Sequence, residues 1–443
     1  MQDLHRLTLS QAAEALHSRK LSPVELTRHC LERIQRLEPK LNAFITVTDD
    51  LAVAMAKAAE QEITSGQYRG PLHGIPVALK DLVDVEGIRT TAASHVLDEN
   101  VAQSDAEVTR RLRQAGAVIF GKTNLHEFAY GGSGLISAYG AARNPWDTVR
   151  ITGGSSSGSA AAVAAGLCFM AIGTDTAGSI RLPSAFCGLV GLKPTHGLVS
   201  AEGVVELSRS LDHVGPMTRT VEDARVAMEA LAEMDPARSF SKVRIGVARE
   251  FFLEDAQPEV VSVWEKAISS IAELGEVRET KVPIDNDRTL QKAESYQYHR
   301  QFSDRASLYD PQTLQRIETG AETSPAEIES LRRALKSFRT DSARVFDDVD
   351  ILATLTTPME APRIDDLDGK PELRAAELLM LRNTRPFNVL GWPTITIPCG
   401  LTSNGLPVGL QLSAGFLQER FLLDFASRCE RILGFSAAPA LLK

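Results

Sequence analysis

Glycine and serine crowd two short stretches of the chain, residues 153–159 (GGSSSGS) and 177–179 (AGS). Each stretch precedes a predicted helix, and a glycine-rich turn at a helix N-terminus exposes backbone N–H groups that stabilise an anion. Hydrolysis of an amide creates such an anion, the tetrahedral oxyanion. Ser179 ends the second stretch, so its hydroxyl could lie beside these N–H groups. One isolated cluster would favour simple helix capping, but two clusters around a predicted buried strand favour a catalytic site.

A lysine supplies a candidate base for this chemistry. Lys80 ends the apolar run IPVALK and is followed by Asp81. A lysine at the end of a buried strand is partly desolvated, which lowers its pKa and leaves a neutral amine that can accept a proton. A surface lysine at the end of a strand is the alternative, and the sequence leaves both open.

These residues lie in longer segments that resemble the amidase signature family. The matching segments are GIPVALKD (74–81), GKTNLHEFA (121–129), GGSSSGSAAAVAAG (153–166), GTDTAGSIRLPSAFCGLVGLKPT (173–195) and SLDHVGPMTRTVEDA (210–224). Weaker similarity continues through PFNVLGWPTITIPCG and GLPVGLQL. The resemblance covers most of the chain apart from about 245–345, and several long segments match in the right order.

The family resemblance implies a Ser–cis-Ser–Lys triad. Its lysine falls on Lys80, its cis-serine on Ser155 and its nucleophile on Ser179. A serine is a poor nucleophile without a base, and an amide leaving group must be protonated as it departs. Neutral Lys80 would take the proton of Ser179 through Ser155, and the same relay would return a proton to the leaving amine. The cis bond would fall at Gly154-Ser155.

The resemblance also implies the residues around the triad. The oxyanion hole would be formed by the backbone N–H groups of Thr176, Ala177, Gly178 and Ser179. The acyl pocket would be lined by Ala129, Tyr130 and Gly131, although Tyr130 could equally be an aromatic core residue. The supporting residues would be Gly154, Ser156, Asp175 and Arg181, with Asp175 and Arg181 paired as ions. No metal site and no cofactor are expected.

Short apolar runs alternate with helical segments from Pro71 onward, which is typical of an α/β fold around a largely parallel or mixed sheet. The family resemblance implies a mixed, twisted central sheet flanked by helices. We expect residues 1–65 to form an N-terminal helical region packed on the core and residues 66–443 to form the amidase signature domain, as one compact unit overall. A polar helical stretch is expected at about 285–345, and Pro407 and Gly409 predict that their strand is short or irregular.

Composition narrows the class of protein. The 443 residues carry a formal net charge of −9, which does not favour direct nucleic-acid binding. No run of about 18 apolar residues predicts a membrane span. The five cysteines form no CxxC pair and indicate reduced thiols in a cytoplasmic protein. The expected partner is a small-molecule amide substrate, and we expect a homodimer.

Three motif matches compete with this interpretation. Residues 116–123 (GAVIFGKT) fit the P-loop pattern, but the middle residues predict a buried strand instead of a phosphate-binding turn. Residues 154–158 (GSSSG) fit the G-x-S-x-G motif of the nucleophile elbow, which would make Ser156 the nucleophile. That motif needs a strand immediately before it, yet the preceding residues are polar and turn-rich. Residues 239–242 fit S-x-x-K but lie in a predicted loop without a KTG partner.

Two functions remain in view: a free-standing amidase acting on a small amide or urea-like compound, and the glutaminase (A) subunit of a tRNA-dependent amidotransferase. The latter typically carries a YDGVRYG-like segment, where this chain has ESYQYHRQFSDRASLYDPQTLQRIETG. It also usually has an acidic residue shortly before PVN, where this chain has LLMLRNTR. These differences favour the free-standing amidase. Arg382 and Arg385 of that segment could meet a substrate carboxylate or lie on the solvated surface. A catalytically dead scaffold is disfavoured because all three triad positions are filled.

Overall fold

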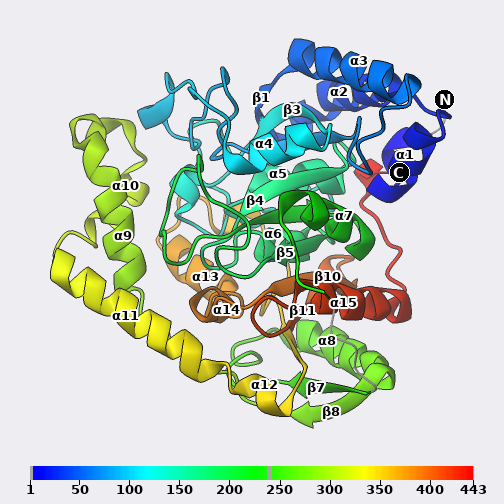
Figure 1. The fold of residues 1–443 in the computed structure, drawn as a ribbon. Coiled ribbons are helices and arrows are strands. Elements are labelled where there is room, and N and C mark those ends of the chain that lie inside the picture. The colour runs from blue at the N-terminus through cyan, green and yellow to red at the C-terminus, as the bar shows by residue number, and fades with distance from the viewer. Residues whose placement is uncertain (1–2, 237–241, 443) are drawn as a thin grey trace.

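Eleven strands form one sheet in the computed structural model, which describes residues 3–236 and 242–442 (Figure 1). In order across the sheet, the strands are β1 (Phe44–Val47), β3 (Val118–Thr123), β2 (Pro76–Lys80), β4 (Met170–Thr174), β6 (Val214–Thr218), β5 (Val190–Lys193), β10 (Thr394–Leu401), β11 (Pro407–Ser413), β9 (Ile351–Leu355), β7 (Val243–Val247) and β8 (Gly275–Glu279). Strands β3, β2 and β4 run parallel, as do β8, β7 and β9, and the strands between these groups pair antiparallel. The predicted mixed α/β sheet is confirmed.

The N-terminal region contains three helices, α1 (Leu9–His17), α2 (Pro23–Leu41) and α3 (Asp49–Thr64). Helix α2 begins where expected, because the Ser22 hydroxyl accepts hydrogen bonds from the N–H groups of Val24 and Glu25. The region is not purely helical, since β1 joins the edge of the sheet antiparallel to β3. The short strand FITV carries no alternating pattern that would have separated it from the flanking helices.

Twelve further α-helices among the described residues cover the sheet or extend from it. They are α4 (Glu107–Gln114), α5 (Ser157–Ala164), α6 (Arg181–Phe186), α7 (Val221–Leu231), α8 (Pro258–Ile271), α9 (Thr289–His299), α10 (Pro311–Glu318), α11 (Pro325–Ser342), α12 (Val345–Asp348), α13 (Leu373–Met380), α14 (Pro386–Leu390) and α15 (Glu419–Leu433). Helices α9, α10 and α11 lie together along one side of the molecule and correspond to the predicted polar helical stretch (Figure 1).

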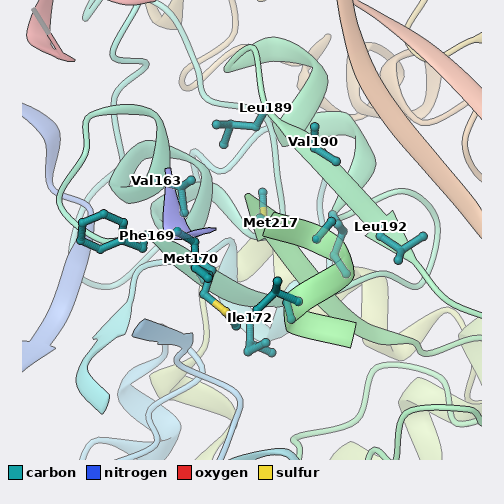
Figure 2. Close-up of a cluster of buried hydrophobic side chains, with 14 of the residues drawn as sticks. Val163, Phe169, Met170, Ile172, Leu189, Val190, Leu192 and Met217 are labelled. Carbon is teal, nitrogen blue, oxygen red and sulfur yellow. The ribbon is translucent and has the colours of Figure 1, made fainter. Parts of the chain in front are cut away.

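Helix α5 lies in the core beside β4 and is fully buried. Figure 2 shows how Val163 of α5 and Met170 of β4 lie among side chains from β5 and β6. The helix approaches the backbone of other segments so closely that a Cβ atom at Gly158 would lie 2.2 Å from the carbonyl oxygen of Ala43. Only glycine fits there, which explains one glycine of the Gly–Ser stretch by packing.

The structure decides several sequence-based expectations. Residues 118–123 form strand β3, so the P-loop match at 116–123 is not a phosphate-binding turn. Strand β11 is seven residues long, and the irregularity lies instead in β10, where the register shifts between Pro398 and Gly400. Residues 239–241 of the S-x-x-K match lie outside the described residues. No helix of the described chain is both long and apolar enough to cross a membrane.

Candidate active site

Lys80, the last residue of β2, has a fully buried side chain. Its Nζ donates hydrogen bonds to Ser155 Oγ at 2.6 Å and to Thr174 Oγ1 at 2.8 Å. Desolvation lowers the pKa of Lys80 to about 7, against the opposing influence of the Asp175 and Asp212 carboxylates. The amine is therefore neutral in a large fraction of molecules near pH 7 and can accept a proton through a hydroxyl.

Asp81 follows Lys80 in the chain but does not contact its amine. Its carboxylate forms a buried ion pair with Lys122 Nζ at 2.9 Å and accepts a hydrogen bond from Thr91 Oγ1 at 2.5 Å. Neighbouring side chains on an extended segment point to opposite sides, so Asp81 faces away from Lys80 as expected. The adjacent carboxylate thus does not hold Lys80 in its charged form.

Ser155 lies in the loop before α5, and the Gly154–Ser155 peptide bond is cis, as the family resemblance implies. The backbone of this loop is held by Gly154 N–H, which donates to Gly132 O at 2.7 Å, and by Ser155 O, which accepts from His126 N–H at 3.0 Å. A Cβ atom at Gly154 would lie 2.7 Å from Gly134 N, so this position requires glycine. These contacts aim the Ser155 hydroxyl at Lys80.

Ser179 lies in the turn between β4 and α6 and is 4% exposed. Ser156 N–H donates to the carbonyl oxygen of Ser179 at 3.2 Å, which joins the two Gly–Ser stretches directly. Ser156 Oγ lies 3.2 Å from Thr174 O and within the core. No described strand immediately precedes Ser156, so the segment lacks the architecture of a nucleophile elbow.

Asp175 and Arg181 fix the turn that carries Ser179. Their buried ion pair has an Nη2–Oδ1 distance of 2.9 Å, and the Arg181 charge and hydrogen bond help to hold the pKa of Asp175 near 2 against desolvation. Asn388 Nδ2 also donates to Asp175 Oδ1 at 2.7 Å. Gly178 has a φ of +136°, and a Cβ atom there would lie 2.0 Å from Thr384 Oγ1. The turn therefore needs glycine immediately before the nucleophile position.

The four backbone N–H groups expected to bind an oxyanion are those of residues 176–179. None of them donates a hydrogen bond to a residue in the described part of the chain. Donors fixed by the surrounding turn and free of other acceptors can stabilise a developing negative charge without reorganisation. The Thr176 hydroxyl points elsewhere and donates to Asp212 Oδ1 at 2.5 Å. Burial raises the pKa of Asp212 to about 7.

A narrow pocket brings Ser179 together with the expected acyl-pocket residues Ala129, Tyr130 and Gly131. The other lining residues are Thr176, Ala177, Leu207, Arg288, Gln291, Arg374 and Leu381. A neighbouring cavity of about 630 Å³ shares Ala129, Thr176 and Leu207 with this pocket. The narrow pocket has a free volume of only about 10 Å³, so most of the open space near Ser179 belongs to the larger cavity.

Sequence reasoning missed five side chains of the narrow pocket: Leu207 and the more distant Arg288, Gln291, Arg374 and Leu381. These last four are the hardest to find. They lie more than 100 residues beyond Ser179, in or near α9 and α13, and no local motif marks them. Tyr130 is both a pocket wall and a core residue, since it is 3% exposed and its hydroxyl donates to Arg316 O at 3.3 Å.

The two arginines proposed from sequence as carboxylate contacts do not line this pocket. Arg382 pairs with Glu254 and with Asp255, the latter at 2.7 Å. Arg385 is buried and donates to the carbonyl oxygen of Asp285 at 2.6 Å. The alternative of a solvated surface role is also wrong for Arg385, which links α14 to the loop before α9.

Comparison with known proteins identifies the family. The family model described as amidase matches residues 25–423 of this chain. The chain belongs to the amidase signature family. The chain is thus an enzyme that hydrolyses carbon–nitrogen bonds. Among the described residues, no group of three or more His, Cys, Asp or Glu side chains could hold a metal ion.

Individual amidase signature relatives cover nearly the whole chain. The chain is 37% identical to a glutamyl-tRNA(Gln) amidotransferase subunit of Caldanaerobacter subterraneus subsp. tengcongensis, over 99% of this chain and 98% of the relative. A solved structure of an amidase superposes with a TM-score of 0.88 at 33% identity, covering 96% of this chain and 99% of that one. The corresponding glutamyl-tRNA(Gln) amidotransferase subunit from Thermotoga maritima superposes with a TM-score of 0.79 at 33% identity, covering 100% and 99%.

Proposed function

We propose that this chain hydrolyses the amide bond of a small molecule through an acyl-enzyme on Ser179. The observation that carries the proposal is the buried Lys80 amine, 2.6 Å from Ser155 Oγ, with its pKa lowered to about 7. A lysine in this state can act as a base near neutral pH. The residue after Ser155 is hydrogen-bonded to Ser179, which supports a role for Ser155 in passing the proton.

In the proposed reaction, Ser179 Oγ attacks the amide carbon while its proton passes to Ser155 and the Ser155 proton passes to Lys80. The oxyanion is bound by backbone N–H groups of residues 176–179. The tetrahedral intermediate collapses, the carbon–nitrogen bond breaks, and the relay returns the proton to the leaving amine. Water, activated by the same relay, then attacks the acyl-enzyme and releases the carboxylic acid.

The glutaminase subunit of a tRNA-dependent amidotransferase is the second candidate. The identity of 37% over nearly full length to a protein named as a glutamyl-tRNA(Gln) amidotransferase subunit favours this candidate more than the sequence motifs suggested. It also weighs against the expectation that the chain has no direct nucleic-acid partner. The relatives thus support the second candidate better than the first, whereas the composition of the pocket favours the free-standing enzyme. The predicted homodimer and cytoplasmic location stay predictions.

Ammonia release from a panel of small amides, including glutamine, tests the proposal. We expect the purified chain to hydrolyse at least one amide without tRNA, ATP, metal or partner proteins, and the Ser179→Ala variant to hydrolyse none. Activity on glutamine that appears only when the other components of an amidotransferase are added would replace our proposal with the second candidate. Loss of activity on chelation would contradict the metal-free mechanism.

A further inference from the structure

The pocket at Ser179 has an unusual charge. Among the described residues that line it, the only charged side chains are Arg288 and Arg374. Leu381 occupies the wall contributed by the segment before Pro386, and that segment (LLMLRNTR) carries no acidic residue. A substrate held beside the nucleophile therefore meets two guanidinium groups and no carboxylate.

Arg288 has no counter-ion in the described part of the chain. Its half-buried side chain donates no hydrogen bond and forms no ion pair with a described residue. Desolvation and the charges of Arg385 and Arg374 lower the pKa of Arg288 to about 9, which leaves the guanidinium protonated near pH 7. Withdrawing a guanidinium from water without a partner is unfavourable, and an anionic ligand would relieve that cost.

Gln291 adds a second unsatisfied polar group in the same pocket. It lies three residues after Arg288, so both side chains project from the same face at the start of α9. Gln291 is 5% exposed, and its buried Oε1 atom has no hydrogen-bond partner. Buried polar groups are normally hydrogen-bonded, so this oxygen would accept a hydrogen bond from a donor such as the N–H group of a substrate amide, and an anionic group of the ligand is left to the arginines.

Arg374 is only partly neutralised. Glu377 lies 3.3 Å from Arg374 Nη1 but also 3.0 Å from Arg316 Nη1, so one carboxylate serves two guanidinium groups. The Arg374 guanidinium also lies 6.0 Å from the ring centroid of Tyr130, which is a pocket wall. Arg288, Arg316 and Arg374 thus place three positive charges around the Ser179 pocket, against the single negative charge of Glu377.

We propose that the substrate carries a carboxylate on its acyl part, separated from the amide by a short spacer and without an adjacent ammonium group. Arg288 and Arg374 bind the carboxylate, and guanidinium groups suit its planar geometry. An α-ammonium group, as in glutamine, would face two like charges beside the apolar Leu381. This inference rests on the proposed function, because it takes the Ser179 pocket to be the site of acyl transfer.

Three amides of equal backbone length test the inference: glutaramate, which carries a carboxylate, glutamine, which adds an ammonium, and valeramide, which carries neither. Succinamate and butyramide repeat the charged and neutral pair with a shorter spacer. We expect kcat/KM to be highest for a carboxylated amide that lacks an ammonium. Arg288→Gln should lower that value at least about ten-fold, the usual scale for losing a charge-assisted hydrogen bond. It should change the value for the neutral amide by less than about three-fold, and Arg288→Lys should restore part of the loss.

Arg382→Gln is the matched control, since Arg382 pairs with Glu254 and Asp255 away from the pocket. It should leave the preference for the carboxylated amide unchanged. Equal kcat/KM values for charged and neutral amides, with no effect of Arg288→Gln, would overturn the inference and leave the function of Ser179 intact. A preference for glutamine over glutaramate would also overturn it.

Binding separates this inference from the proposed function. Calorimetry of the Ser179→Ala variant should detect binding of glutaramate or succinamate, and adding Arg288→Gln should weaken that binding at least about ten-fold. If these compounds bind through Arg288 but no amide is ever cleaved, the proposed function fails and the carboxylate site stands. If neither compound binds, the carboxylate site is wrong.

Discussion

Two buried lysines lie at the ends of the neighbouring parallel strands β2 and β3. Lys80 and Lys122 are 0% and 1% exposed, so burial does not distinguish them. Lys122 forms an ion pair with Asp81 at 2.9 Å and also donates to Thr90 Oγ1 at the same distance. Within the described residues, the hydrogen-bond partners of the Lys80 amine are two hydroxyl groups, those of Ser155 and Thr174. Lys122 thus has a carboxylate in direct contact, whereas the carboxylates of Asp175 and Asp212 act on Lys80 without an ion pair.

The contrast indicates which surroundings would let a buried lysine act as a base. A carboxylate neighbour stabilises the ammonium form, whereas a hydroxyl neighbour compensates little of the desolvation cost and can itself carry a proton. A lowered pKa is not sufficient on its own to place a lysine in a proton relay. Burial also lowers the pKa of Lys193, but Lys193 Nζ donates to the carbonyl oxygens of Trp392 at 2.6 Å and Pro194 at 3.0 Å, which carry no proton. The partner of the amine decides its role.

The largest effect is expected at the far end of the Lys80 relay. Ser179→Ala should reduce kcat at least about 1,000-fold, because no hydroxyl remains to form the acyl-enzyme. Ser156→Ala is the matched control, since Ser156 Oγ contacts Thr174 O within the core and should cost less than about ten-fold. Ammonia release and circular dichroism of both variants would measure this. A dead Ser156→Ala enzyme beside an active Ser179→Ala enzyme would make Ser156 the nucleophile.

The next effect concerns Lys80 itself. Only the neutral amine accepts a proton, so activity should fall as pH drops through about 7 and rise to a plateau above it. This limb belongs to the coupled Lys80–Ser155–Ser179 system. Lys80→Ala should lower kcat about 100-fold or more and lose the limb, and Lys80→Arg should not restore it because guanidinium stays protonated. A pH–rate profile on one substrate tests this, and an active Lys80→Arg enzyme with an unchanged limb would make Lys80 structural.

Lys122 should affect stability instead of chemistry. Lys122→Met leaves the Asp81 carboxylate buried without its counter-ion, which typically costs about 3 kcal/mol of unfolding free energy. The double variant Lys122→Met/Asp81→Leu removes both charges and should lose less. Urea unfolding of the single and double variants measures the difference. If Lys122→Met kept full stability but lost turnover, the distinction between the two lysines would fail.

The smallest effect is expected at the second hydroxyl around Lys80. Thr174→Val keeps the shape of the side chain but removes the partner 2.8 Å from Nζ. The loss of one hydrogen bond should lower kcat about five-fold and keep the acid limb, because the route through Ser155 remains. Steady-state kinetics above and below pH 7 would measure this. A loss as large as that of Lys80→Ala would place Thr174 in the proton path.

The sequence singled out Lys80, Ser155 and Ser179 because each lies in a local motif, and the structure places the amine of Lys80 in contact with Ser155. Lys80 ends a buried strand, and Ser155 and Ser179 lie in glycine-rich turns whose glycines the packing requires, as at Gly154 and Gly178. The α/β class also followed from local alternation of strands and helices. Such features depend on residues close together in the chain, so they are visible without a structure.

The rest of the pocket could not be predicted, because it forms by long-range packing. Arg288 and Arg374 reach the pocket from the start of α9 and from α13, outside the segments that carry the motifs. The sequence instead suggested Arg382 and Arg385, which lie in the right segment but form contacts elsewhere. Strand β1 was missed for a related reason, since only its pairing with β3 makes four residues a strand.

The most direct test of the central claim is the charge of Lys80 in the folded enzyme. Lysine labelled with ¹³C at Cε reports protonation through its chemical shift, and the Lys80→Arg variant assigns the signal. We expect the Lys80 signal to titrate with a midpoint near pH 7, matching the acid limb of the rate profile. A Lys80 signal that remains that of an ammonium group up to about pH 10, as in an ordinary lysine, would contradict its role as the base.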